Sequence, residues 1–157
     1  MTSRGAFLNK TYNAYAHRKI PVEDVELTHV GPGTPGGEYL RRFWHPVIYM
    51  EELTDVPVAT RILGEDLVVF QDFSGQLGVL EANCPHGGHS LEFGSVCERG
   101  VRCLHGWLID VDGTILEIPG EPGNCPLEDR QFHGAYATHE AAGAVFVYMG
   151  PPDKKPP

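Results

Sequence analysis

Cysteine and histidine occur as a close pair twice in this sequence, in the stretches "NCPHGGH" and "VRCLHGW". In an extended segment, residues i and i+2 point to the same side, so each Cys-x-His pair directs both of its side chains at one spot. Sixteen residues, positions 87–102, separate the two pairs. A fold that uses both pairs has to bring two loops together at one end. The four candidate ligands are Cys84, His86, Cys103 and His105.

Two thiols and two imidazoles form a ligand set for a metal centre. They can hold a two-iron cluster, with the thiolates on one iron and the imidazoles on the other, or a single zinc ion in tetrahedral geometry. A glycine follows each pair, at Gly87 and at Gly106, and lets the backbone come close to a bulky centre.

The cysteines are better explained as ligands or free thiols than as disulfides. The first twenty residues hold no apolar stretch long enough for a signal peptide, and no later run approaches the ~18 apolar residues of a membrane span. We therefore expect a cytoplasmic protein, in which thiols stay reduced. Cys97 and Cys125 lie outside the paired pattern and are predicted to be free thiols.

Short runs of β-branched residues, broken by turn residues, predict that strands dominate the chain after position 44. The Asp-Gly step in "VDGT" predicts a hairpin within residues 107–118. Ahead of the strands, Thr34 is predicted to cap a short helix that begins at Pro35. Together these features predict an all-β fold, a small antiparallel sandwich or barrel with the two Cys/His loops at one tip. The predicted strands are 45–50, 58–63, 66–71, 77–82, 135–141 and 144–150.

Composition suits one small globular domain and argues against some classes of partner. A length of 157 residues fits a single domain, and 19 glycines with 13 prolines indicate many turns. The formal net charge is −9, from 12 basic and 21 acidic residues. A chain this acidic is not expected to have nucleic acid or an anionic membrane as its main partner.

The stretches around both pairs resemble a known family. "CPH" and "RCLHGWLIDVDGTILEIPGE" resemble the Rieske [2Fe–2S] domain of ring-hydroxylating non-haem iron oxygenases, in particular the phthalate-dioxygenase-like group. "VGPGTPGGEYLRRFWHPV" and "AGAVFVYMGPP" resemble the segments that enter and leave this domain in the oxygenase α subunit. The resemblance covers about residues 30–152 and rests on a specific motif.

The resemblance implies the electron-transfer domain of an aromatic-ring-hydroxylating oxygenase component, an oxidoreductase. It implies electrons supplied by an NAD(P)H-dependent reductase or a ferredoxin, and a head-to-tail homotrimer. It divides the chain into an N-terminal arm (1–29), the Rieske domain (30–150) and a linker (151–157) towards a catalytic domain absent from this chain. The implied ligands of a Rieske [2Fe–2S] cluster are Cys84, His86, Cys103 and His105.

In the family, the electrons pass to a mononuclear iron held by two histidines and a carboxylate in that catalytic domain. His133 and His139 are spaced too widely, without an acidic residue at a suitable offset, to supply such a site here. We therefore expect this chain alone to lack the catalytic iron site.

The second pair departs from the family pattern, which has Cys-x2-His at this place. Cys103-Leu104-His105 is one residue shorter, and such a deletion shifts a ligand by up to ~3.3 Å. We therefore expect weak or partial occupancy by the cluster. The alternative is a Rieske-fold structural or interaction module that holds zinc or no metal. His89 lies near enough in sequence to replace a displaced ligand.

Overall fold

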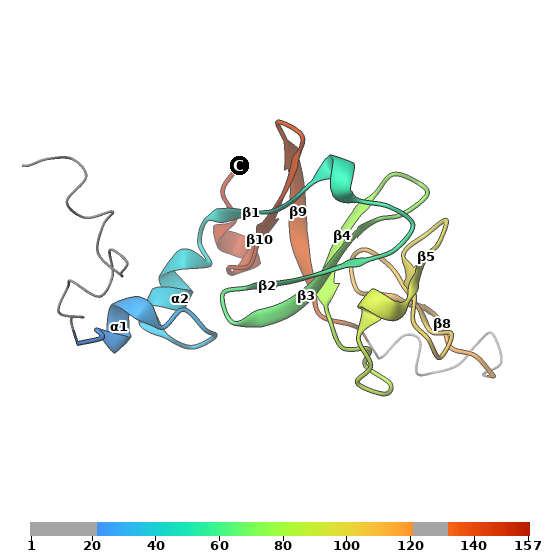
Figure 1. Cartoon of the computed structure of the whole chain (residues 1–157), viewed down its shortest axis with the longest axis horizontal. Helices are drawn as coiled ribbons and strands as arrows, with labels where there is room; N and C mark the ends of the chain where they lie inside the picture. Colours follow the sequence, from blue (N-terminus) through green and yellow to red (C-terminus); the bar gives the residue numbers. More distant parts are fainter. Residues whose placement is uncertain (1–21, 121–131) are drawn as a thin grey trace, which may run out of the picture.

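The computed structural model describes residues 22–120 and 132–157 and shows an antiparallel β fold (Figure 1). The larger sheet has the strand order β1-β10-β9-β4-β3-β2, and the smaller sheet has the order β5-β6-β7-β8. The all-β prediction is confirmed, and all six predicted strands are found within two residues of their predicted bounds. The strands are β1 (Trp44–Tyr49), β2 (Val58–Ile62), β3 (Glu65–Gln71), β4 (Leu77–Glu81), β5 (Ser95–Val96), β6 (Val101–Arg102), β7 (Leu108–Ile109), β8 (Ile115–Glu117), β9 (Ala135–Ala141) and β10 (Ala144–Tyr148).

Within residues 22–120 and 132–157, helical structure is limited to short elements. The predicted cap is confirmed, because the Thr34 hydroxyl accepts from the Gly37 N–H at 3.1 Å at the start of α2. The segment predicted as a linker, residues 151–157, contains one 3₁₀ turn, η4 (Pro152–Lys154), and is therefore partly helical. These elements are α1 (Val25–Thr28), α2 (Pro35–Leu40) and the 3₁₀ turns η2 (Met50–Glu52), η3 (Leu91–Phe93) and η4 (Pro152–Lys154).

A buried arginine ties the end of α2 to the larger sheet. Arg41 is only 6% exposed, and its guanidinium pairs with the carboxylate of Glu65 and donates to the Leu63 carbonyl at 3.0 Å. The Tyr136 hydroxyl donates to the same carboxylate. Because a buried charge is costly unless it is paired, this network fixes the end of α2 against β3 and β9.

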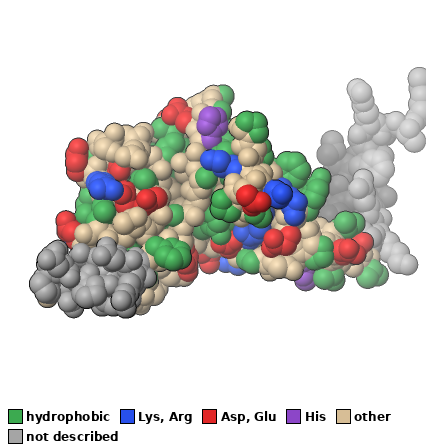
Figure 2. Space-filling model, turned by 180° about the vertical axis from the view of Figure 1, so that it is seen from behind, with side chains coloured by type: hydrophobic (Ala, Val, Ile, Leu, Met, Phe, Trp, Pro, Cys, Tyr) green, Lys and Arg blue, Asp and Glu red, His purple; other side chains and the backbone are tan. Residues whose placement is uncertain are grey.

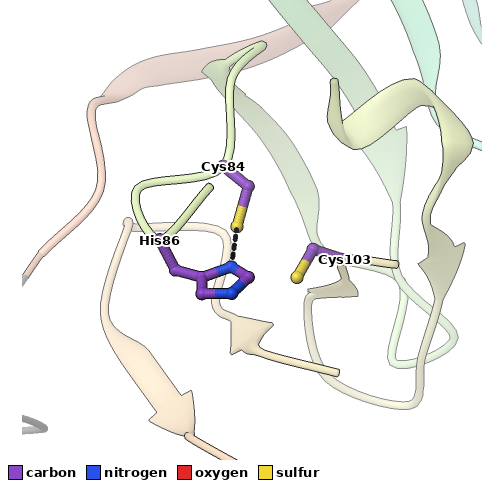
Figure 3. A group of neighbouring side chains, drawn as sticks. All are labelled: Cys84, His86 and Cys103. Atoms are coloured by element: carbon purple, nitrogen blue, oxygen red, sulfur yellow. Dashed lines mark hydrogen bonds between the residues drawn. The ribbon is translucent and has the colours of Figure 1, made fainter. Parts of the chain in front are cut away.

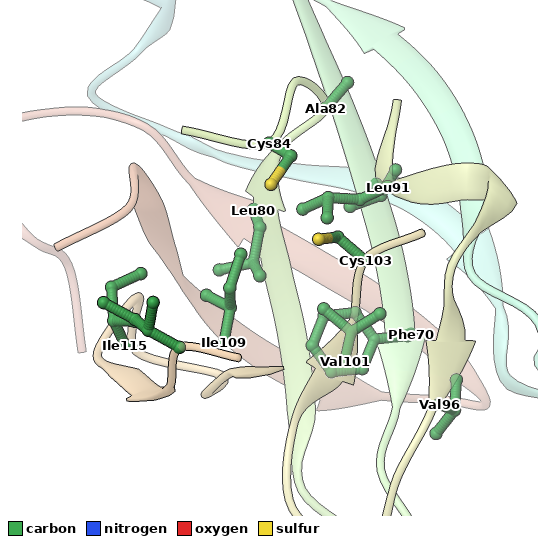
Figure 4. Packing of buried hydrophobic residues seen from close by; sticks show 12 residues of the cluster. Phe70, Leu80, Ala82, Cys84, Leu91, Val96, Val101, Cys103, Ile109 and Ile115 are labelled. Atoms are coloured by element: carbon green, nitrogen blue, oxygen red, sulfur yellow. The ribbon is translucent and has the colours of Figure 1, made fainter. Parts of the chain in front are cut away.

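Strand β3 is buried on both faces and separates two hydrophobic cores. Successive side chains of a strand point to opposite sides, so Val68 and Phe70 enter one core while Leu67 and Val69 enter the other. The first core lies between the larger and the smaller sheet (Figure 4). It consists of Val68, Phe70, Leu80, Ala82, Cys84, Leu91, Val96, Val101, Cys103, Ile109, Ile115 and Ile118. The second consists of Leu63, Leu67, Val69, Val79, Val145, Val147 and Met149.

The surface outside these cores carries charges of both signs. Figure 2 shows acidic and basic side chains interspersed on the described part of one face. Among the described residues, no helix is both long and apolar enough to span a bilayer.

The first core depends on a glycine in β4. Gly78 pairs with Phe70 across the β3–β4 ladder, and a Cβ at Gly78 would lie 2.5 Å from Cζ of the Phe70 ring. The fully buried ring therefore lies over the bare backbone of its neighbouring strand.

We predict that Gly78→Ala destabilises the fold by about 1–3 kcal/mol, because the added methyl group forces the Phe70 ring out of its packed position. Chemical denaturation of the purified variant measures the free energy of unfolding. Gly31→Ala is the matched control, since a Cβ there meets nothing within 4 Å. Equal stability of the two variants would contradict the prediction.

Candidate metal centre

The two Cys/His loops lie side by side, as predicted. The first loop leaves β4, and its Cys84 N–H donates to the His89 carbonyl at 2.8 Å, which folds the loop back on itself. The second loop joins β6 to β7 in the smaller sheet. One donor atom from each of Cys84, His86 and Cys103 lies within 4.8 Å of the other two (Figure 3). Residues from both loops therefore converge on one spot.

The shortened second loop closes as a regular hairpin turn. The Cys103 N–H donates to the Trp107 carbonyl at 2.9 Å, and the Gly106 N–H donates to the Cys103 carbonyl at 2.9 Å. Gly106 has a φ of 89°, which only glycine adopts readily, and a Cβ there would lie 2.7 Å from Cγ of Pro119. A turn followed by a left-handed residue is a common three-residue hairpin loop. The loop thus loses one residue while β6 and β7 stay paired.

The thiols lie inside the protein and the imidazoles lie at its surface. Cys84 is 2% exposed and Cys103 is 6% exposed, and both belong to the first core. His86 and His105 are exposed. This arrangement places the sulfur donors on the core side of the site and the nitrogen donors on the solvent side.

Burial, together with the neighbouring Cys103 thiol, raises the pKa of Cys84 to about 11. Its sulfur lies 3.8 Å from Nδ1 of His86. At neutral pH the metal-free site therefore holds Cys84 as a thiol, and a metal ion has to displace its proton to bind the thiolate.

Three imidazoles gather at the exposed side of the site. His105 is not among the three residues whose donor atoms all lie within 4.8 Å of one another, but its ring centroid lies 4.5 Å from that of His86. The ring centroid of His89 lies 4.9 Å from that of His105. The Trp107 ring stacks on His86 at 5.1 Å with an interplanar angle of 25°. His105 is therefore placed beside the compact group of three donors.

These donors fit the expected group by their chemistry. Two buried thiols opposite two exposed imidazoles match a two-iron cluster in which two cysteines hold one iron and two histidines hold the other. The same donor set satisfies the Cys₂His₂ preference of a structural zinc ion.

Cys97, His133 and His139 lie away from this group of donors. Cys97 is a half-buried free thiol outside the group, as predicted, and Cys125 falls outside the described residues. His133 is buried, and its Nε2 lies 2.7 Å from the Glu81 carbonyl, so it supports the end of β4. His139 lies in β9 beside Trp44, with ring centroids 5.8 Å apart.

Sequence reasoning missed the side chains that support the ligands. Trp107 packs against the first core and also covers one face of the His86 ring. No role was predicted for Arg102, yet its guanidinium donates to the Gly106 carbonyl at 2.7 Å. Its position directly before Cys103 was the one available signal.

Comparison with known proteins identifies the domain. The family described as "Rieske [2Fe-2S] domain" matches residues 43–139, a span that includes both Cys/His loops. This chain belongs to the Rieske domain family. The resemblance found in the sequence is confirmed, and the cofactor that defines the family is the [2Fe–2S] cluster.

Relatives of this Rieske domain include oxygenase subunits. The chain is 52% identical over 149 residues to the tert-butanol monooxygenase / tert-amyl alcohol desaturase oxygenase subunit of Aquincola tertiaricarbonis, covering 92% of this chain and 32% of that protein. It is 43% identical over 140 residues to the phthalate 4,5-dioxygenase oxygenase subunit of Pseudomonas putida, covering 87% and 32%. A solved oxygenase–ferredoxin complex of carbazole 1,9a-dioxygenase matches with a TM-score of 0.63 and 30% identity, covering 74% and 31%. The chain thus spans about a third of the length of these relatives.

We predict that Zn²⁺ added to the metal-free Rieske domain near pH 7.5 releases protons, because the raised pKa keeps Cys84 protonated until metal binds. Since metal and proton compete for the sulfur, affinity should rise with pH through the neutral range, below the raised pKa of Cys84. Proton release into weakly buffered solution is measured with a pH indicator. Cys84→Ser should release about one proton fewer. Cys97→Ser, which removes a thiol outside the group, should behave like the unaltered chain. The same release from both variants would refute the assignment of Cys84.

Proposed function

We propose that this Rieske domain is the electron-transfer domain of an aromatic-ring-hydroxylating oxygenase component. In this role it passes electrons from a reductase to a mononuclear iron. The observation that carries the proposal is the layered site, with buried thiols beneath exposed imidazoles. Membership of the Rieske family and the oxygenase subunits among its relatives support it.

Each part of the site has a distinct task under this proposal. Cys84 and Cys103 would hold the inner iron in the first core, where water is excluded. His86 and His105 would hold the outer iron and present their exposed ring edges to a partner. When bound, a Rieske cluster supplies one-electron exchange at a potential of about −150 to +300 mV. The Trp107 ring covers one face of His86 and restricts its rotation.

The partners follow from the same proposal. The electron donor would be an NAD(P)H-dependent reductase or a ferredoxin, and the solved oxygenase–ferredoxin complex of carbazole 1,9a-dioxygenase is an example among the structural relatives. The mononuclear iron would belong to a catalytic domain, and we propose a head-to-tail homotrimer from the family resemblance. Reduced ligand cysteines also favour the cytoplasm.

A zinc-holding Rieske module is the second candidate. It is favoured by the compactness of the three donors within 4.8 Å, which suits a single ion, and by the position of His105 beside rather than within that group. Metal analysis separates the two candidates.

We predict that the chain expressed in iron-replete cells contains iron and acid-labile sulfide, with the visible absorption of a Rieske cluster that a reductase with NADH bleaches. Because the second loop is short, we expect fewer than about two irons per chain. Iron, sulfide and zinc assays with an absorption spectrum measure this. Zinc without labile sulfide would contradict the electron-transfer proposal and support the second candidate.

We further predict that inserting Tyr between Leu104 and His105 raises the iron content, because it restores the Cys-x2-His spacing and lets His105 reach the outer iron. Inserting Ala at the same place is the matched control, which separates loop length from the aromatic ring. If the unaltered chain already carries a full cluster and neither insertion changes it, the three-residue loop is competent as it stands.

A further inference from the structure

We propose that Arg102 and Glu117 act as a positioning pair that holds the second ligand loop closed, so that His105 is fixed at the exposed side of the site. This inference rests on the proposed role of the loop in metal binding. Neither residue is a candidate ligand, and both would act through the loop backbone.

The guanidinium connects the loop to two strands. Nη1 of Arg102 donates to the Gly106 carbonyl at 2.7 Å, and Nη2 pairs with Oε2 of Glu117 at 2.6 Å. Arg102 lies in β6 directly before Cys103, and Glu117 lies in β8 on the far side of β7. One side chain thus spans from β6 across the end of the loop to β8.

The bond from Arg102 to the Gly106 carbonyl adds a constraint that the backbone hydrogen bonds of the loop do not supply. Within the loop, backbone hydrogen bonds join Cys103 to Trp107 and Gly106 to Cys103. The carbonyl that Arg102 holds belongs to Gly106, whose backbone has a left-handed φ of 89°. By fixing this carbonyl, Arg102 limits the rotation of the backbone immediately after His105. Glu117 limits the rotamers of the Arg102 side chain.

The exposure of the Arg102 and Glu117 side chains allows a positioning role to be distinguished from a contribution to global stability. The side chains of Arg102 and Glu117 are 37% and 56% exposed, and ion pairs this exposed contribute little to global stability. A merely structural surface pair would therefore change nothing at the loop when broken. A positioning pair changes the opening of the loop and the metal affinity while leaving global stability nearly unaltered.

The first test measures amide hydrogen exchange in the metal-free chain. Glu117→Gln removes the charge that holds Arg102, so the amides of Cys103 and Gly106 should exchange about 2–5-fold faster, as expected for a half-exposed ion pair. Arg102→Lys replaces a planar fork with a single ammonium and should act in the same direction. Asp66→Asn is the matched control, because it breaks another exposed pair, Arg61–Asp66 at 2.8 Å, in strands β2 and β3.

The second test titrates the metal-free variants with Co²⁺, whose visible spectrum reports the donor set. Because the metal-bound site needs the closed loop, Glu117→Gln should bind Co²⁺ about 2–5-fold more weakly, in line with its faster loop exchange, and Asp66→Asn should not. The thermal unfolding midpoints of the two metal-free variants should agree. Unchanged loop exchange, or unchanged Co²⁺ affinity and spectrum, would overturn the positioning role. If the unaltered chain binds neither Co²⁺ nor iron, the proposed function fails, while the exchange data still decide whether the pair holds the loop.

Discussion

The proposed metal centre depends on the hydrophobic core, because its two candidate sulfur ligands are core residues. Cys84 and Cys103 pack in the same cluster as Leu80, Leu91 and Val101, between the two sheets (Figure 4). Packing of this kind fixes the sulfur atoms without any metal present, and the same burial keeps Cys84 protonated. The fold therefore holds the two sulfur atoms in place before a metal binds. Because Cys84 is protonated in the metal-free protein, metal binding to its sulfur would release that proton.

The exposed side of the site is held by weaker forces. His86 and His105 are exposed and are restrained by the Trp107 stack, a hairpin turn and the bond from Arg102 to the Gly106 carbonyl. Such contacts permit larger adjustments than close-packed core side chains do. Because the two candidate histidine ligands lie on the solvent side, their positions can adjust to a loop one residue shorter than the family pattern.

Much of this arrangement could be predicted before the structure, and the particular residues show why. Thr34 as a helix cap and the strands around Val68 and Phe70 follow from local propensity and period. The family resemblance also identified Cys103 as the partner of the first loop, and the structure brings it together with Cys84 and His86. The closure of the short loop could not be foreseen, because it depends on the left-handed Gly106 and on how closely Pro119 approaches it.

The sequence by itself determined the antiparallel strands, the two loops and the types of ligand they carry, since each is written in neighbouring residues with a fixed period or spacing. Only the tertiary structure decided that Cys84 is buried, that Trp107 covers His86, and that Arg102 meets Glu117 fifteen residues away. These contacts cross between strands and loops. They follow from strand register and core packing, which no local stretch of sequence specifies alone.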